Sequence, residues 1–189
     1  MCAPHWKRAM MEEMSALEKN ETWEIVDLPP GKKTVGSKCK WVYTVKFQPS
    51  GEIERYKARL VARGFTQTKG IDYGETLSTE AKVISIRILL SLATQRSWPL
   101  YQLDVKNAFL HGDSHEEVYI EIAPGYGRKG ESHKVCRLKK ALYGLKQSPR
   151  AWFEKFSKAI VSFGYKRCAS DHTHFVIKGE KVSRIIVNV

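Results

Sequence analysis

The chain has 189 residues, of which 42% are hydrophobic and 28% are charged, and its formal net charge at pH 7 is +12. This length and composition suit one ordinary domain with a hydrophobic core. No run approaches the roughly 18 apolar residues of a membrane span, and the first residues lack the apolar core of a signal peptide. The 4 cysteines include no Cys-x-x-Cys pair, so we expect an intracellular protein with reduced thiols and no membrane association.

The positive charge is concentrated in two blocks. Residues 31–70 contain 10 Lys or Arg and 2 Asp or Glu, which is a net of +8, and residues 128–167 contain 12 and 2, a net of +10. Residues 71–127 between them contain 4 and 8, a net of −4. Aromatic residues alternate with the cations in both blocks. This pattern suits the phosphate backbone of a nucleic acid, although most charge runs are only solvated surface.

The first half of the chain predicts one helix and three strands. Trp6, Met10, Met14 and Leu17 recur at helical spacing in an opening helix that stops near Asn20. Short apolar or alternating runs then predict strands at 23–26, 41–47 and 53–62, of which the last two form a twisted basic hairpin.

The second half continues the mixture of helices and strands. A helix is expected over 83–95, and strands over 100–105, 118–122, 135–138, 175–178 and 182–189, the last two joined by a turn at 179–180. The fold class predicted from these elements is α+β, with helices packed against antiparallel strands.

One further helix is predicted from its end signals. Ser148 is expected to cap it, Pro149 to occupy its first turn and Gly164 to stop it. Its apolar stripe is expected to run from Trp152 to Phe163.

Asp104 is the side chain most suggestive of chemistry, because it stands near the end of a predicted apolar strand. A carboxylate in that place can project into a cleft and bind Mg²⁺ through oxygen, although a single Asp at a strand end is more often a helix cap. Cys168, His172 and His174 do not have the spacing of a zinc finger, and Asp171 with His172 favours a cap or a turn.

Four segments in the same order resemble the reverse transcriptase of copia-type LTR retrotransposons. They are the opening helix around Trp6 to Leu17, KARLVARGFTQ at 57–67, QLDVKNAFLHG at 102–112 and ALYGLKQSPRAW at 141–152. The resemblance implies that residues 1–189 are a partial reverse transcriptase domain. It implies the fingers and an incomplete palm of a right-hand polymerase. The fingers-like part would comprise residues of about 20–97, and the palm-like part residues of about 98–189.

The resemblance also implies a role for individual residues. Asp104, with the Val105 carbonyl, would hold two catalytic Mg²⁺ ions, and Phe109 would crowd the sugar 2′ position. Lys57 and Arg59, which share one strand face, would grip the incoming dNTP. The other implied nucleotide-binding residues are Tyr143, Gly144 and Lys146. The implied contacts to an RNA or DNA template-primer are Arg63, Gln147 and Arg150. Without the resemblance, Phe109 would be read as core and Lys57 with Arg59 as a solvated hairpin edge.

The family pattern places a Tyr-x-Asp-Asp turn after an apolar strand such as 185–189, and no Asp-Asp pair occurs in this sequence. We therefore expect a fragment of a Pol polyprotein that ends before this motif and does not polymerise alone. A non-catalytic nucleic-acid-binding remnant is the alternative. A chain that does not fold stably, because its palm sheet is incomplete, is the third.

Overall fold

The computed structural model describes residues 3–36, 39–76, 80–126, 133–178 and 183–187. The helices are α1 (Pro4–Lys19), α2 (Val83–Gln95) and α3 (Ser148–Ser162), with two 3₁₀ turns, η1 (Gly64–Thr66) and η2 (Ala108–His111). The strands are β1 (Trp23–Asp27), β2 (Lys40–Phe47), β3 (Ile53–Val61), β4 (Tyr119–Glu121), β5 (Lys134–Leu138), β6 (Lys166–Arg167), β7 (His174–Ile177) and β8 (Ser183–Ile186).

The strands form three antiparallel sheets, with orders β1-β5-β4, β2-β3 and β6-β7-β8. The predicted α+β class with antiparallel strands is therefore confirmed. The predicted turn at 179–180 lies outside the described residues.

Helix α1 forms as its sequence predicts. Pro4 occupies the first turn, where its missing N–H would have no partner in any case, and Ala9, Met14 and Leu17 face the core. The helix ends at Asn20, whose side-chain amide donates to the Ala16 carbonyl at 2.7 Å.

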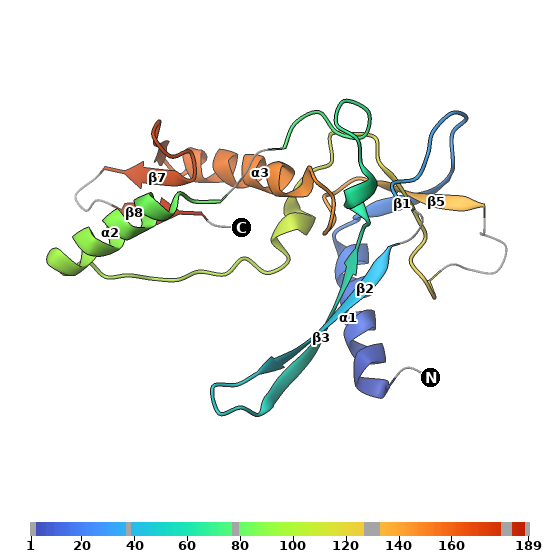
Figure 1. The fold of residues 1–189 in the computed structure, drawn as a ribbon, viewed down its shortest axis with the longest axis horizontal. Coiled ribbons are helices and arrows are strands. Elements are labelled where there is room, and N and C mark those ends of the chain that lie inside the picture. The colour runs from blue at the N-terminus through green and yellow to red at the C-terminus, as the bar shows by residue number, and fades with distance from the viewer. Residues whose placement is uncertain (1–2, 37–38, 77–79, 127–132, 179–182, 188–189) are drawn as a thin grey trace.

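The β2–β3 hairpin packs one aromatic face on α1. The Trp6 ring lies 5.0 Å from the Tyr43 ring and 4.8 Å from the Tyr56 ring, both in edge contacts. The tip of the hairpin projects away from the rest of the chain (Figure 1). The opposite face of the hairpin carries the cations that are described below.

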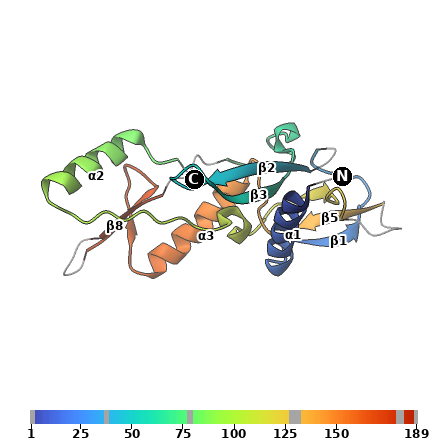
Figure 2. The same ribbon diagram turned by 90° about the horizontal axis from the view of Figure 1, so that it is seen from below.

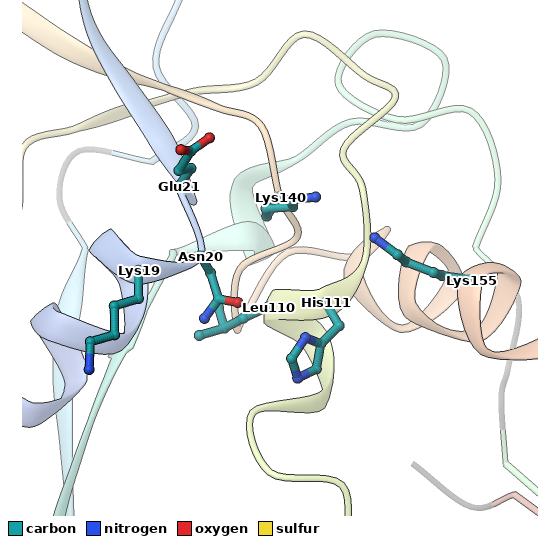
Figure 3. A pocket seen from close by; sticks show the side chains of 7 residues that line it. All are labelled: Lys19, Asn20, Glu21, Leu110, His111, Lys140 and Lys155. Carbon is teal, nitrogen blue, oxygen red and sulfur yellow. The ribbon is translucent and has the colours of Figure 1, made fainter. Parts of the chain in front are cut away.

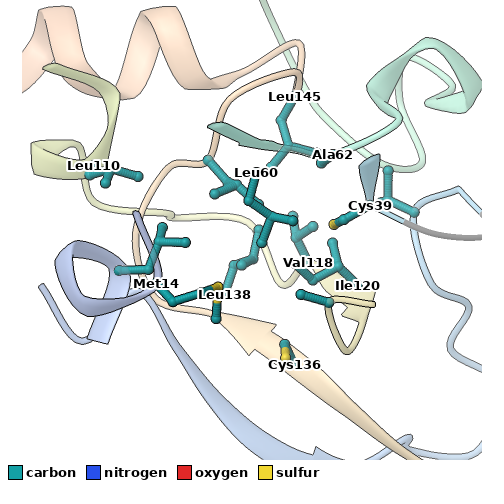
Figure 4. Packing of buried hydrophobic residues seen from close by; sticks show 14 residues of the cluster. Met14, Cys39, Leu60, Ala62, Leu110, Val118, Ile120, Cys136, Leu138 and Leu145 are labelled. Atoms are coloured by element: carbon teal, nitrogen blue, oxygen red, sulfur yellow. The ribbon is translucent and has the colours of Figure 1, made fainter. Parts of the chain in front are cut away.

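The larger core gathers side chains from distant segments. Leu60 of β3, Leu110 of η2 and Leu142 from the loop after β5 are each fully buried in it, together with Met14 and Leu17 of α1. Figure 4 shows these segments converging on one apolar centre. This core fixes the position of α1, β3 and the loop after β5 relative to one another.

A second core lies between α3 and β7. Phe175 is 0% exposed, and its ring centroid lies 6.2 Å from that of Phe153 and 6.0 Å from that of Phe156. The predicted stripe along α3 is wrong at its C-terminal end. Phe163 is 73% exposed, because the second core contacts α3 around Trp152, Phe153, Phe156 and Ile160 and does not include Phe163.

Two other predictions are wrong. Residues 100–105 form no strand and are exposed, with Leu103 at 87%, because no described strand pairs with them. Gln147, not Ser148, is the N-cap of α3, and Ser148 lies inside the helix with its hydroxyl donating to the Leu142 carbonyl at 2.5 Å. A serine that faces a buried carbonyl cannot also cap the helix.

The long irregular segment after α2 crosses the molecule. Helices α2 and α3 and the β6–β7–β8 sheet lie at one end, and α1, β1, β5 and the hairpin lie at the other (Figures 1 and 2). Because β1 pairs with β5, and α2 lies beside β8, the fingers-like and palm-like stretches interleave in space. The division at residue 97 stays a prediction.

Candidate functional site

One face of the β2–β3 hairpin carries a row of cations. Arg55, Lys57 and Arg59 alternate along β3, and across the strand pair Lys46 stands opposite Arg55. The pKa of Lys57 is lowered, first by burial and then by the neighbouring Arg59 and Arg55. The hairpin therefore presents concentrated positive charge on the face it turns away from its aromatic contacts with α1, and Lys57 and Arg59 share a face as predicted.

Arg59 lies against two aromatic rings from other segments. Its guanidinium carbon is 5.1 Å from the centre of the Tyr143 ring, and the Phe109 ring centroid is also 5.1 Å from that of Tyr143. Burial raises the pKa of the Tyr143 hydroxyl, and the Arg59 charge opposes that rise. We call Arg59, Tyr143 and Phe109 the Arg59 cluster. Within the described part of the chain, the buried Nε of Arg59 has no hydrogen-bond partner.

Asp104 lies on the irregular segment that leads to this cluster. Its side chain is exposed, and its charge is among the causes that raise the pKa of Tyr143, which places the carboxylate within electrostatic reach of that ring. Val105 next to it is 44% exposed. The structure thus brings Arg59, Tyr143 and Phe109 together from three separate parts of the sequence, and Asp104 precedes Phe109 by five residues.

Asp104 belongs to no cluster of metal-binding side chains among the described residues. No group of three or more His, Cys, Asp or Glu side chains gathers anywhere in the described ranges. A two-metal site needs several clustered oxygen ligands, so the residues present do not fit it by themselves.

Glu13 is a buried acid that the sequence prediction did not include in the site. It is 6% exposed, and its Oε1 accepts a hydrogen bond from the Leu60 backbone N–H at 3.3 Å, on the open edge of β3. Burial raises its pKa, whereas the Leu60 N–H, Arg59 and Lys57 lower it by less. The sequence contained one signal for this buried acid, because Glu13 lies in the apolar stripe of α1, where an acid is not expected.

Glu13 gives a prediction with two variants. Because its pKa is raised in the folded state, its charge opposes folding once the pH rises above the ordinary value near 4.5. Glu13→Gln, which keeps an acceptor for Leu60, should gain stability over wild type as the pH rises from 4 to 8. Glu13→Leu should be less stable than Glu13→Gln by about 1–3 kcal/mol, because the Leu60 N–H is left without a partner. Denaturant melts across this pH range measure both, and equal pH profiles for wild type and Glu13→Gln would contradict the first.

Gln67 joins two of the four segments that resemble the family, 57–67 and 141–152. Its side-chain Nε2 donates to Gln147 Oε1 at 2.9 Å, and its side-chain Oε1 accepts from the Lys146 backbone N–H at 2.9 Å. The Lys146 amine donates to the backbone carbonyl of Gln67 at 3.3 Å. Gln147 is only 3% exposed. In this conformation Gln147 supports the loop and has almost no surface to offer a nucleic acid, while Lys146 is exposed and lies over the Tyr73 ring.

Arg63 and Arg150, both expected to contact nucleic acid, are half-buried. Arg63 packs against Gly36. Arg150 pairs with Glu154 at 2.8 Å and Glu75 at 3.7 Å, and the hydrogen bond to Glu154 is the main cause that raises the pKa of Arg150. A phosphate would have to compete with these carboxylates for Arg150.

Gly144 carries a positive φ of 90° beside Tyr143 and lies against the backbone of residue 62. The Ala62 N–H donates to the Tyr143 carbonyl at 2.8 Å, so the loop continues the edge of β3. These contacts place the ring of Tyr143 against Arg59.

Residues 20–189 match the family described as "Reverse transcriptase (RNA-dependent DNA polymerase)". The chain belongs to the reverse transcriptase family. This confirms the resemblance drawn from the four segments.

Three relatives of this reverse transcriptase domain are retrotransposon polyproteins. It is 45% identical over 185 residues to the "Retrovirus-related Pol polyprotein from transposon RE2" of Arabidopsis thaliana, and 44% identical over 185 residues to the RE1 polyprotein of the same plant. It is 49% identical over 164 residues to the polyprotein of transposon TNT 1-94 of Nicotiana tabacum.

These alignments cover 97%, 97% and 87% of this chain but only 13%, 13% and 12% of the relatives. The reverse transcriptase domain thus spans about an eighth of the length of the polyproteins it matches. No solved structure matches it. None of the described helices has the length and apolar character needed to cross a bilayer.

Proposed function

We propose that this reverse transcriptase domain contributes the triphosphate-gripping side of a DNA polymerase site and the first of its metal-binding carboxylates. The observation that carries the proposal is the Arg59 cluster, in which a cation of the basic hairpin lies against Tyr143 and Phe109, close to Asp104. Arg59 is half-buried, and its guanidinium carries five N–H donors in a fixed fork that suits phosphate oxygens.

In this proposal Arg59 and Lys57 bind the phosphates of an incoming deoxynucleotide. The Tyr143 ring holds the guanidinium plane by a cation–π contact. Phe109, half-buried against Tyr143, faces the sugar. The partners are a dNTP and an RNA or DNA template-primer, with the remainder of a Pol polyprotein alongside. Mg²⁺ is the proposed cofactor of the complete enzyme, and the residues of this chain supply one carboxylate toward it.

Arg59→Ala tests the proposal. Loss of one charge-assisted hydrogen bond to phosphate removes about 1.5–3 kcal/mol, so the dissociation constant for dATP should rise about 10- to 100-fold. Titration calorimetry with dATP measures it. Arg55→Ala is the matched control, because Arg55 lies on the same strand face but outside the cluster. It should change the constant by less than about threefold.

The second candidate function is nucleic-acid binding without catalysis, and the hairpin cations favour it. Lys46, Arg55, Lys57 and Arg59 form a charged face that needs no cluster to attract phosphates. If Arg55→Ala weakens dATP binding as much as Arg59→Ala does, the specific grip is wrong and this second function is preferred.

We further propose that the 189-residue polypeptide does not extend a primer by itself. Asp104 is not part of any group of three or more His, Cys, Asp or Glu side chains among the described residues, and the sequence contains no Asp-Asp pair. A lone carboxylate binds Mg²⁺ weakly, because the hydrated ion gives up its water reluctantly. A primer-extension assay on a poly(rA)·oligo(dT) substrate should show no Mg²⁺-dependent product. Product that disappears in Asp104→Asn would refute the proposal.

A further inference from the structure

A groove outside the Arg59 cluster follows the exposed side of α1. It consists of two adjoining cavities of about 790 Å³ and about 360 Å³, which share Lys19 and Asn20 at the C-terminal end of the helix. The larger cavity lies between α1 and the segment at Lys106 and Asn107. The smaller one continues past Lys19 to His111 and to Lys140 and Lys155 (Figure 3). We call the two together the α1 groove.

The α1 groove is strongly basic. Its two cavities are lined by six Lys or Arg and by two Glu, Glu12 and Glu21, so the formal charge of the lining is 6 − 2 = +4. The six cations are Lys7, Arg8, Lys19, Lys106, Lys140 and Lys155. No Phe, Tyr or Trp of the described residues lines it, so it offers charge without a surface for stacking bases.

Two of the cations are held in place by a shared acid. Asp113 binds the Lys140 amine at 2.5 Å and the Lys155 amine at 3.0 Å, although the lysines come from the loop after β5 and from α3. Figure 3 shows the two amino groups directed toward each other, with Lys19 extending away on the other side of Asn20. Each ammonium has three donors, so both keep donors for an anion after binding Asp113. Counting Asp113, the local charge is still +3.

We propose that the α1 groove binds the phosphodiester backbone of a nucleic-acid strand, without regard to base sequence. The 16 residues of α1 span about 24 Å, which matches about seven phosphates at 3.4 Å each. Lys106 follows Asp104 by two residues. A nucleic-acid strand that leaves the groove at Lys106 would therefore pass beside Asp104, the predicted metal ligand. This inference rests on the proposed function, since it assigns a path to the nucleic acid that the polymerase site would use.

The test is the salt dependence of oligonucleotide binding by the 189-residue chain. Fluorescence anisotropy with a labelled 12-mer of oligo(rU), and separately of oligo(dT), gives the association constant between 50 and 200 mM NaCl. Each lost phosphate contact should make the log–log slope shallower by about 0.7. Lys19→Ala and Lys106→Ala should each show this change, and the double variant about twice as much. Because the groove reads only the backbone, RNA and DNA should respond alike.

Lys158→Ala is the control, because Lys158 is an exposed lysine on α3 that lines neither cavity, one turn from Lys155. It should leave the slope unchanged. Circular dichroism melts confirm that every variant is folded. The groove assignment is overturned if Lys19→Ala and Lys106→Ala keep the wild-type slope while Arg59→Ala weakens dATP binding, and in that case the proposed function stands.

Two other results would also overturn it. Absence of oligonucleotide binding by the wild-type chain at 50 mM NaCl rejects the groove, and dATP binding then decides the proposed function separately. Displacement of the oligonucleotide by poly-glutamate at a lower charge concentration than unlabelled oligo(rU) requires would show that the groove prefers an acidic peptide.

Discussion

Gly144→Ala is expected to lower the free energy of unfolding by about 3–5 kcal/mol, which is a large share of the stability of an ordinary domain. A Cβ on Gly144 would lie 2.2 Å from the Ala62 carbonyl oxygen and 2.6 Å from Cγ1 of Val61. The first of these is backbone of a segment bound to the core through Leu60, so it cannot move aside cheaply. The positive φ of 90° adds about 1 kcal/mol for any residue with a side chain.

Two other glycines separate the two contributions. Gly51 has a φ of 87° and nothing within 4 Å of its Cβ position, so Gly51→Ala should show only the conformational part. Gly64 lacks a positive φ, but its Cβ would lie 2.1 Å from the Gly144 carbonyl oxygen, so Gly64→Ala should show the steric part. Urea melts measure all three variants. If Gly144→Ala and Gly51→Ala had the same midpoint of urea unfolding, the close approach of Gly144 to the Ala62 backbone would be disproved.

This result bears on the site as well as on the fold. The Ala62 N–H donates to the Tyr143 carbonyl at 2.8 Å, next to Gly144. Forcing the two backbones apart would withdraw the Tyr143 ring from Arg59. Gly144 was predicted to bind nucleotide, and the close contact explains a need for glycine there before any nucleotide is present.

Asp171→Ala is expected to detach α2 from the C-terminal sheet and to lower stability by about 2–3 kcal/mol at pH 7. The buried carboxylate accepts hydrogen bonds from the Thr173 N–H at 3.0 Å, the Thr173 hydroxyl at 2.6 Å and the Lys82 N–H at 3.3 Å. Lys82 is the N-cap residue of α2 and has no side-chain cap of its own. Asp171 therefore caps a helix that lies 89 residues earlier in the chain.

The contribution of Asp171 depends on pH in a definite direction. Burial raises the pKa of its carboxyl, but hydrogen bonds from Ser85, Thr173 and Lys82 lower it by more, so the pKa lies well below its usual range. A group whose folded pKa is lowered stabilises the fold above its unfolded pKa, near 3.8, and loses that effect as the pH falls. Asp171→Ala should thus lose the part of the acid sensitivity that wild type shows below about pH 4.

Thermal melts at pH 7 and pH 3 check this prediction, with His172→Ala as the control. His172 is exposed beside Asp171, so its removal should leave the melting temperature unchanged at both values. Equal loss of stability in Asp171→Ala at pH 7 and pH 3 would show that the carboxylate does not act through its charge.

Sequence patterns alone placed most of the local structure. The bounds 83–95 of α2 were predicted as observed, because Pro99 and the apolar run delimit that helix locally. Helix α1 and the β2–β3 hairpin followed for the same reason, since their turns and periodicities lie within a few residues. The family followed from the segments 57–67, 102–112 and 141–152, each of which is a contiguous run inside the matched residues 20–189.

Other features depended on partners that are distant in the chain. Residues 100–105 have the composition of a strand but no described strand pairs with them, and a strand forms only with a hydrogen-bonded neighbour. The sequence indicated that Asp171 lies in a cap or a turn. It did not indicate that Asp171 caps α2, the helix that begins at Val83. The places of Glu13 at the edge of β3 and of Gln147 inside the loop were equally hidden.

The sequence by itself therefore determined the family, the fold class and the elements whose signals are local. The tertiary structure decided which charged side chains face each other, how Arg59 meets Tyr143, and that the cations around α1 line one groove. The physical reason is that periodicity and turn residues act over a few positions, whereas burial and charge pairing depend on which distant segments the core brings together.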